Sequence, residues 1–239
     1  MAISGVLLDI EGTILPVTFV RDVLFPYSKQ RMESFLRERS ADHLVRQWAA
    51  LCQEAIALEQ GLRPSYEDLA PLLGRWITED RKHPGLKALQ GMIWEEGYQS
   101  GVFAPRLYED VPPALHRWYR NGLRLALYSS GSEQAQRLLI EHTTAGNLSR
   151  LFSDFFDTTV GAKIETVSYG RIAGRLGLLP PAILFFSDVE PELDAAAAAG
   201  LRTVHVVRPG TKTGSGHPTC STFTDLSEIG AALGSSLVE

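Results

Sequence analysis

The chain opens with a short apolar run that stops abruptly at an acidic loop. Residues 3–8 are mostly apolar, and an Asp-x-Glu-Gly sequence begins at Asp9. A short apolar run closed by turn-forming residues is typical of a buried strand that enters a loop. The sequence therefore predicts a first strand that ends just before Asp9.

The pattern changes between Val20 and Glu109, where apolar residues recur at helical spacing and charged residues stand between them. Breaks fall at Gly61–Pro64, Pro71 and His83–Gly85, because glycine and proline interrupt regular structure. We predict that this stretch is almost wholly helical.

After Pro112–Pro113, apolar runs that predict strands alternate with amphipathic stretches that predict helices. The predicted strands are Leu123–Tyr128, a short one near Phe155–Phe156, Ile183–Phe186 and Thr203–Val207. The predicted helices are Ala114–Asn121, Thr166–Leu176 and Glu192–Ala199. Such alternation indicates a parallel, doubly wound sheet with right-handed crossovers. We therefore predict an α/β fold with a helical block, residues 20–110, inserted after the first strand. The glycine-rich segment 209–217 is predicted to be a mobile loop.

Composition and charge narrow the class of protein. The chain has 239 residues, of which 44% are hydrophobic and 21% charged, as in ordinary globular enzymes. The net charge of −5 is spread along the chain, which argues against a nucleic-acid partner. The start of the chain lacks the basic region of a signal peptide, and the alanine run Ala195–Ala199 is too short to cross a bilayer.

The residues that bind metals or form disulfides in other proteins are scarce. Two cysteines, Cys52 and Cys220, lack metal-ligand spacing and fit a reducing compartment. The six histidines include no pair at metal-binding spacing and are interpreted as non-catalytic. We expect a cytoplasmic protein with neither a membrane nor a nucleic-acid partner.

Reactive residue types follow the predicted strands, and the first of them is the acidic loop. In open α/β sheets, ligands bind outside the carboxyl ends of the strands. A carboxylate at Asp9 could attack phosphorus and form an aspartyl-phosphate. Glu11 could protonate the leaving oxygen and later activate water, and Gly12 would permit the turn that this requires. The alternative is that Asp9 caps a helix and Glu11 is a solvated loop residue.

Three more predicted strand ends or loops carry suitable residues. Ser129 and Ser130 stand before a helix, whose N-terminus attracts anions, although serine turns also cap helices without a ligand. Lys163 is expected at the head of a helix, where a bound anion would explain its charge. Asp188, with Glu192 four residues later, offers oxygen ligands for Mg²⁺ or an ordinary cap. The order of all four signals along the chain favours the functional interpretation.

At these residues the chain resembles the haloacid dehalogenase superfamily, whose first motif is Asp-x-Asp-Gly-Thr. The second acid here is Glu11 instead of aspartate. In this respect the chain is similar to a narrower family, the acireductone synthases (enolase-phosphatases) of methionine salvage. The motif and the segment after it, residues 16–27, carry the resemblance most specifically. Segments 89–98, 128–132, 186–189 and 207–210 agree with it.

The resemblance implies a Rossmann-like core, residues 1–19 and 111–239, with a helical cap, residues 20–110. It also implies one Mg²⁺ and two reactions. The family enolises 2,3-diketo-5-methylthiopentyl-1-phosphate and then removes its phosphate, which gives 1,2-dihydroxy-3-keto-5-methylthiopentene. A small phosphorylated diketone is thus the expected partner, and we expect a monomer.

Carried onto this sequence, the resemblance assigns a role to each strand-end residue. Asp9, Glu11 and Asp188 are the acids expected around the metal. Catalysis is assigned to Asp9, Glu11 and Lys163, and phosphate binding to Ser129, Ser130 and Lys163. Whether Glu11 ligates Mg²⁺ through its backbone carbonyl while its carboxyl moves protons stays open at this point.

The residue that abstracts the carbon-bound proton also stays open. Glu95 and Glu96 lie in a Gly-flanked segment of the predicted cap and are candidates, although they could equally be solvated helix residues. Glu11 is the competing base.

Other functions compete with this one. The nearest is a capped phosphatase of the same superfamily that acts on another small phosphate ester, such as a sugar phosphate. A dehalogenase needs neither Mg²⁺ nor a second acid at Glu11. A phospho-accepting receiver domain also uses an aspartate, Mg²⁺ and a lysine, but it is about half as long and has no helical insertion after its first strand.

Overall fold

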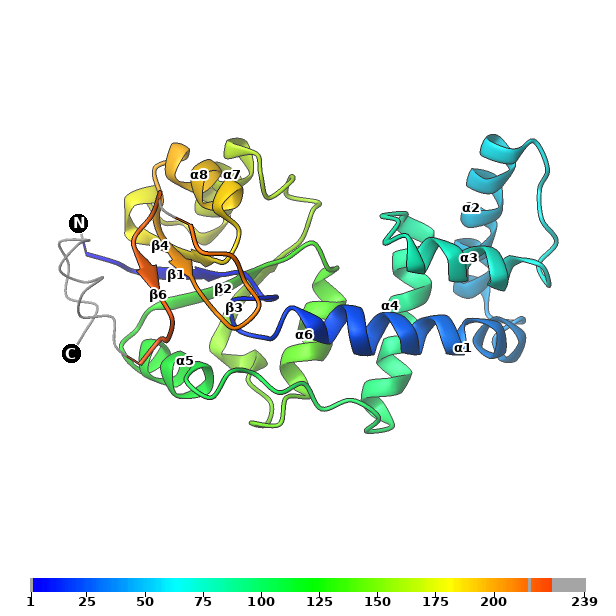
Figure 1. Ribbon diagram of the computed structural model, residues 1–239, viewed down its shortest axis with the longest axis horizontal. Helices are drawn as coiled ribbons and strands as arrows, with labels where there is room; N and C mark the ends of the chain where they lie inside the picture. The colour runs from blue at the N-terminus through cyan, green and yellow to red at the C-terminus, as the bar shows by residue number, and fades with distance from the viewer. Residues whose placement is uncertain (1, 215, 225–239) are drawn as a thin grey trace. The chain divides into compact units, whose positions relative to one another are not determined.

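A single parallel sheet forms the centre of the computed structural model, which describes residues 2–214 and 216–224. Within these residues the strand order is β3-β2-β1-β4-β5-β6 (Figure 1). The strands are β1 (Gly5–Leu8), β2 (Arg124–Tyr128), β3 (Phe152–Phe156), β4 (Ile183–Ser187), β5 (Arg202–Val206) and β6 (Thr219–Cys220). Strand β1 pairs with β2 on one side and with β4 on the other. The strand order therefore reverses at β1, which is where doubly wound sheets bind ligands.

Helices cover both faces of this sheet, which explains why its central strands β1, β2 and β4 are mostly apolar and buried. The helices are α5 (Val111–Arg120), α6 (Glu133–Glu141), α7 (Thr166–Leu176) and α8 (Glu190–Ala198), with single 3₁₀ turns η2 (Ser149–Leu151) and η3 (Pro180–Ala182). Figure 1 shows α7 and α8 on one face and α5 and α6 on the other. Leu7 belongs to a buried cluster with side chains of α7 and α8. On the other face, Trp118 of α5 stacks on Phe186.

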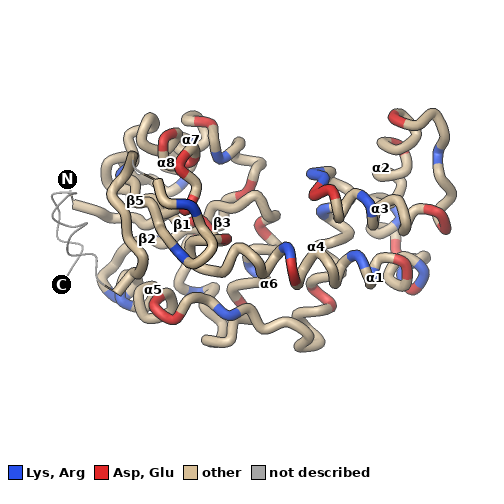
Figure 2. Tube along the Cα trace, viewed as in Figure 1, with Lys and Arg blue, Asp and Glu red and all other residues tan. Residues whose placement is uncertain are grey.

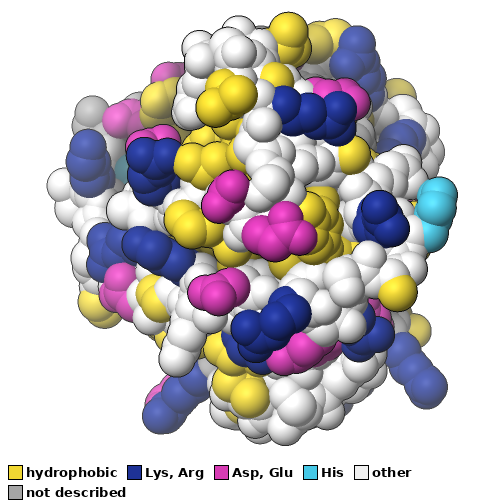
Figure 3. All heavy atoms as spheres, turned by 90° about the vertical axis from the view of Figure 1, so that its right-hand side faces the viewer, with side chains coloured by type: hydrophobic (Ala, Val, Ile, Leu, Met, Phe, Trp, Pro, Cys, Tyr) yellow, Lys and Arg dark blue, Asp and Glu magenta, His cyan; other side chains and the backbone are white. Residues whose placement is uncertain are grey.

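The chain divides into two compact units. One, here called the core unit, contains Met1–Val17 and Ala104–Glu239, and the other, the helical unit, contains Thr18–Phe103. The sequence-based boundaries, after residues 19 and 110, differ from these by two and seven residues. Acidic and basic residues both occur along each unit (Figure 2), and both signs of charge are interspersed on the face drawn in Figure 3.

The helical unit contains four helices and a π-helical turn. They are η1 (Val20–Leu24), α1 (Phe25–Glu38), α2 (His43–Gln60), α3 (Leu69–Thr78) and α4 (Pro84–Gln99). Local sequence explains the ends of α2: Asp42 caps it by accepting hydrogen bonds from Leu44 N and Val45 N, and Gly61 ends it with φ of 71°. Apolar residues of all four helices form one buried cluster.

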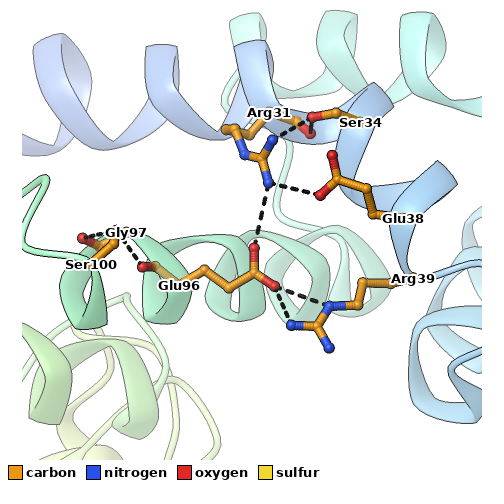
Figure 4. Close-up of polar contacts among 7 residues, drawn as sticks. All are labelled: Arg31, Ser34, Glu38, Arg39, Glu96, Gly97 and Ser100. Atoms are coloured by element: carbon orange, nitrogen blue, oxygen red, sulfur yellow. Dashed lines mark hydrogen bonds and ion pairs between the residues drawn. The ribbon is translucent and has the colours of Figure 1, made fainter.

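Ion pairs also join two of these helices. The Glu96 carboxylate of α4 lies 2.7 Å from the Arg39 guanidinium, directly after α1, and 3.6 Å from that of Arg31 (Figure 4). Arg31 also contacts Glu38 and Ser34 of its own helix. Glu96 is therefore tied to α1 by two arginines.

The predicted α/β fold is confirmed, and several element boundaries are corrected. The prediction of helix as far as Glu109 is wrong, because α4 ends at Gln99 and Gly101 turns the chain with φ of 74°. Helix α5 begins three residues before the predicted Ala114, since Pro112 and Pro113 fit its first turn. Helix α8 spans Glu190–Ala198 rather than Glu192–Ala199.

Two strands also differ from their predictions. Strand β3 begins at Phe152 rather than near Phe155, and β6 was not predicted because it has only two residues. The predicted mobile loop, 209–217, includes Ser215, which lies outside the described residues. Its described part is anchored, since Gly216 N donates to Glu190 Oε1 at 2.9 Å. No helix in the described parts of the chain is long and apolar enough to cross a membrane.

Candidate active site

The predicted site residues follow the carboxyl ends of neighbouring strands in the core unit. Asp9 follows β1, Ser129 follows β2 and Asp188 follows β4. Because β1 pairs in parallel with both β2 and β4, these three ends lie on the same edge of the sheet. The Asp9 backbone continues the ladder, as its N–H donates to Phe186 O at 2.9 Å.

A buried lysine joins two carboxylates at this edge. Lys163 Nζ lies 2.5 Å from Asp9 Oδ1 and 2.6 Å from Glu192 Oε2. The three side chains are only 10%, 7% and 11% exposed. Burial alone would lower the pKa of Lys163, but the charges of Asp9 and Glu192 outweigh it and raise that pKa. The ammonium group is therefore firmly protonated.

Two further hydrogen bonds hold Glu192 and the backbone of Lys163 in place. Ser187 Oγ donates to Glu192 Oε2 at 2.9 Å, which orients the glutamate. Tyr169 OH donates to the backbone carbonyl of Lys163 at 2.7 Å. The lysine and its partners are thus preorganised by residues of β4 and α7.

Asp188 is the third buried acid of the site. Its Oδ1 has no hydrogen-bond partner among the described residues. Burial and the negative charge of Asp9 raise the pKa of Asp188 to about 7. Its backbone carbonyl accepts from His205 Nε2 at 3.1 Å, and a Cβ atom at Gly12 would collide with its carboxylate. Only glycine at position 12 allows Asp188 to approach the turn after Asp9.

This arrangement fits a divalent cation. When Asp9, Asp188 and Glu192 are all ionised, the single ammonium of Lys163 leaves two negative charges uncompensated. The available donors are oxygens, which Mg²⁺ prefers. Across the described residues, no three or more His, Cys, Asp or Glu side chains gather as a metal-binding group. Mg²⁺ does not require such a group, since one or two carboxylates with other oxygens and waters commonly hold it.

A tight turn carries Glu11. Gly12 N donates to Leu15 O at 2.7 Å, and Ile14 N and Leu15 N both donate to Ile10 O at 2.9 and 3.0 Å. Gly12 has φ of 74°, a backbone conformation that residues other than glycine rarely adopt. The backbone of residues 10–15, called the nucleophile turn below, is therefore closely constrained.

The serine turn after β2 is distinct from a helix cap. Ser132, not Ser129 or Ser130, caps α6, because its Oγ accepts from Ala135 N at 3.3 Å. Ser129 is buried, and its Oγ accepts from Gly131 N at 3.1 Å, while Ser130 is exposed. The two serines predicted to bind phosphate thus stand at the strand end, ahead of the capping residue.

Known proteins resemble nearly the whole length of the chain. Residues 3–200 match the family model of haloacid dehalogenase-like hydrolases. The chain is 48% identical to enolase-phosphatase E1 of Gluconacetobacter diazotrophicus, and the match covers 94% of this chain and 93% of that protein. It is 47% identical to enolase-phosphatase E1 of Azotobacter vinelandii, over 94% and 97% of the two chains. The chain belongs to the enolase-phosphatase E1 family.

Solved structures share the fold of this chain. The UTR4 protein of Saccharomyces cerevisiae has a TM-score of 0.76 and 31% identity, with 93% of this chain and 99% of that chain covered. CbbY of Rhodobacter sphaeroides, at 16% identity and a TM-score of 0.59, shares the fold alone. The predicted resemblance and the prediction of a hydrolase are therefore confirmed.

Two features of the site differ from what the sequence indicated. Lys163 does not head a helix, because α7 begins at Thr166 with Glu165 before it. Its charge is met by Asp9 and Glu192 rather than by a helix-bound anion. Glu192, which the sequence offered as a second acid for a metal, contacts Lys163 instead. The spacing from Asp188 marked Glu192 as a site acid, but its partner depends on a loop that is distant in sequence.

Proposed function

We propose that the chain is a bifunctional enolase-phosphatase of methionine salvage. It enolises 2,3-diketo-5-methylthiopentyl-1-phosphate and then hydrolyses the phosphate ester, which yields 1,2-dihydroxy-3-keto-5-methylthiopentene and phosphate. The names of its relatives support the pair of reactions. The observation that carries the proposal is the buried Asp9–Lys163–Glu192 arrangement beside Asp188 at the carboxyl edge of the sheet.

Phosphate removal starts with Asp9. One of its carboxylate oxygens attacks phosphorus, the bond from phosphorus to the ester oxygen breaks, and that oxygen takes a proton from Glu11. Water then attacks phosphorus and gives a proton to Glu11, and the bond from phosphorus to the Asp9 oxygen breaks, which releases phosphate and restores Asp9. Lys163 donates to Asp9 Oδ1 and holds the carboxylate in place during both steps.

Phosphate binding is assigned to Lys163 and the serine turn. The ammonium group is a compact positive charge, which suits the oxygens of a phosphoryl group. Ser129 and Ser130 stand at the neighbouring strand end, with hydroxyl groups that can donate to phosphate oxygens.

Mg²⁺ fits the acids of this site. The carboxylates of Asp9 and Asp188 with the backbone carbonyl of Glu11 would hold it, and this division leaves the Glu11 carboxyl to move protons. When bound, Mg²⁺ would supply positive charge to neutralise the phosphoryl oxygens. The excess negative charge of the three buried acids and the unpartnered Asp188 Oδ1 support this assignment.

One experiment tests the two reactions together. The diketone phosphate is supplied with Mg²⁺, and ultraviolet absorbance and free phosphate are followed in the same sample. We expect absorbance of the enolised product and phosphate to appear together. Phosphate release from a sugar phosphate at a higher kcat/KM than from the diketone would favour the alternative, a phosphatase for another small ester.

The setting of this enzyme is also a prediction. We propose that it works as a monomer in the cytoplasm, where Cys52 and Cys220 stay as thiols. Both are unpaired by disulfides in the structure, and burial raises the pKa of each thiol to about 12. Light scattering on the purified protein measures the oligomeric state directly.

A further inference from the structure

A buried arginine contacts the nucleophile turn but takes no part in the chemistry described above. Arg208 is 6% exposed and follows β5. Its Nε donates to the backbone carbonyl of Thr13 at 3.2 Å. The two terminal nitrogens of its guanidinium donate to Asp110 Oδ1 and Oδ2 at 2.9 and 2.8 Å, and one of them also donates to Ser221 O at 2.8 Å.

Asp110, the acid that pairs with Arg208, is also largely buried and accepts a further hydrogen bond. The Asp110 side chain is 13% exposed, and its Oδ2 also accepts from Phe223 N at 2.7 Å. Removing two charges from water is costly, and a buried pair tolerates that cost only with good geometry and further hydrogen bonds. Both conditions hold here. In several proteins a buried ion pair fixes a defined geometry rather than adding to overall stability.

Arg208 and Asp110 join two stretches of chain that are distant in sequence. Thr13 belongs to the nucleophile turn, a few residues before the chain leaves the core unit. Asp110 belongs to the stretch that follows the chain's return to that unit. A backbone hydrogen bond from Tyr108 N to Ile14 O, 3.1 Å long, joins the same two stretches. The carbonyl of Thr13 is thus held by a side chain from outside the nucleophile turn, in addition to the backbone hydrogen bonds that close the turn.

We propose that Arg208 and Asp110 are positioning residues that set the path of the nucleophile turn, and through it the placement of Glu11 relative to Asp9. This inference rests on the proposed function, in which both acids act on one phosphoryl group. A planar guanidinium reaches Thr13 O, Ser221 O and both Asp110 oxygens at once, whereas the single ammonium of lysine cannot. Catalysis is sensitive to displacements of about 1 Å, so a loosened turn lowers turnover without loss of substrate contacts.

The chain offers a matched control for this proposal. The guanidinium of Arg117 donates to Phe223 O at 2.8 Å and so supports the same C-terminal stretch, residues 221–223. It has no hydrogen bond to the nucleophile turn among those found in the described residues. Arg208→Lys and Arg117→Lys each keep the charge and each lose an arginine contact with this stretch, but only Arg208→Lys releases Thr13.

The test compares the full-length variants with Mg²⁺ and an aryl phosphate, and measures kcat, KM, thermal stability and hydrogen exchange of the peptide that contains residues 9–15. We expect Arg208→Lys to lower kcat by about tenfold to a hundredfold with KM within about threefold, and to speed exchange in that peptide. Arg117→Lys is expected to lower Tm but to leave kcat and that exchange close to wild type. Asp110→Asn, which keeps the arginine, is expected to resemble Arg208→Lys and replaces it if that variant does not fold.

Unchanged exchange of residues 9–15 in both Arg208→Lys and Asp110→Asn would overturn the proposal. Equal loss of kcat in the Arg208→Lys and Arg117→Lys variants would overturn it too, because general destabilisation would then account for the effect. Exchange is measured without substrate. If the wild-type protein releases no phosphate with Mg²⁺, the proposed function fails, and exchange still decides whether Arg208 sets the turn.

Discussion

Lys163 is surrounded by more negative charge than it can neutralise. Its ammonium contacts Asp9 and Glu192, and Asp188 is close enough for the charge of Asp9 to raise its pKa. Buried like charges are tolerated only where something compensates them. At the scale of single residues, the site is therefore a negatively charged cluster around one fixed cation, and it is suited to a second, exchangeable one.

Replacement of Asp9 tests the nucleophile. Asp9→Asn is expected to abolish phosphate release from every substrate, because an amide is a poor nucleophile and offers no charge to a metal. The variant keeps the size of the side chain, so a thermal melt serves as the control for folding. Free phosphate is measured with an aryl phosphate, and a variant that kept even about a tenth of wild-type turnover would show that another group attacks phosphorus.

Lys163 is expected to be irreplaceable even by another cation. Lys163→Ala should lower kcat by at least about a hundredfold, because the phosphoryl oxygens and Asp9 lose a buried positive partner. Lys163→Arg should recover little, since a planar fork does not fit between two carboxylates that are 2.5 and 2.6 Å from the ammonium. The control is Lys82→Ala, because Lys82 also pairs with an acid but is 58% exposed. Near-normal turnover by Lys163→Ala would remove the residue from the mechanism.

Chelation tests the second cation. Excess chelator is expected to stop phosphate release, and added Mg²⁺ to restore it, because the site's oxygen donors suit a hard cation. Zn²⁺ is expected to restore much less, since no histidine or cysteine lies in the motifs. Calorimetric titration of Mg²⁺ into wild type and Asp188→Asn provides a readout that does not depend on turnover. Full activity in excess chelator would contradict the Mg²⁺ assignment.

At the scale of elements, the sequence predicted best where one local rule decided the outcome. Helix α7 spans Thr166–Leu176 as predicted, because its amphipathic repeat is undisturbed. Residues 100–109 were wrongly included in the predicted helical stretch because apolar residues recur there with charged residues between them. There Phe103 and Leu107 are buried in irregular chain instead. In so short a stretch, a buried irregular segment and a buried helix show the same pattern of apolar residues, and only the fold distinguishes them.

The same limit applies to the candidate site. Asp9, Ser129 and Asp188 could be found from sequence, because each directly follows an apolar strand and strand ends meet at one edge. The contacts of Lys163 could not, since its loop is 154 residues from Asp9. Arg208 and Asp110 carry no local signal for each other, as they are 98 residues apart.

The segments that Arg208 and Asp110 join are expected to lose stability in acid. Burial alone would raise the pKa of Asp110, but hydrogen bonds from Arg208 and Phe223 N outweigh it and lower that pKa. A carboxyl whose pKa falls on folding stabilises the protein above its unfolded pKa of about 4, and that stabilisation is lost as the pH falls through the folded pKa. The difference in free energy of unfolding between wild type and Asp110→Asn should therefore be largest near neutral pH and shrink below about pH 4.

Urea denaturation at a series of pH values measures this difference. The matched control is Asp22→Asn, because Asp22 also pairs with an arginine, but its side chain is 52% exposed and solvent screens the interaction. A difference for Asp110→Asn that stays constant through the acid range would mean that the carboxylate is not held in its ionised form.

At the scale of the whole molecule, the chain combines a core unit that carries the proposed phosphatase residues with a helical unit inserted after the nucleophile turn. Phosphoryl transfer needs only residues of the core unit. Enolisation needs in addition a base that removes a proton from the carbon bearing the phosphate ester. An inserted unit of this kind commonly serves to exclude water and complete a site. The two reactions should therefore respond differently to changes in the helical unit.

Glu95 and Glu96 are the carboxylates of α4 that could supply this base, and the structure separates them. Glu96 accepts hydrogen bonds from Arg39 and forms an ion pair with Arg31, so its oxygens are engaged in holding α4 to α1 (Figure 4). Glu95 accepts a hydrogen bond from Gln99 Nε2 of the same helix at 3.3 Å. We therefore expect Glu96→Gln to lower stability by no more than about 1 kcal/mol and to keep both reactions.

Glu95→Gln is the decisive variant. We expect it to lose diketone turnover while it hydrolyses an aryl phosphate normally, because only the diketone needs a proton taken from carbon before the ester is cleaved. Both substrates are assayed on Glu95→Gln, Glu96→Gln and wild type, with phosphate release as the common readout. If both variants keep full activity on the diketone, the helical unit supplies no base. Glu11, already on the nucleophile turn beside Asp9, then becomes the group that must take the proton, and one carboxyl would serve enolisation and phosphate transfer in succession.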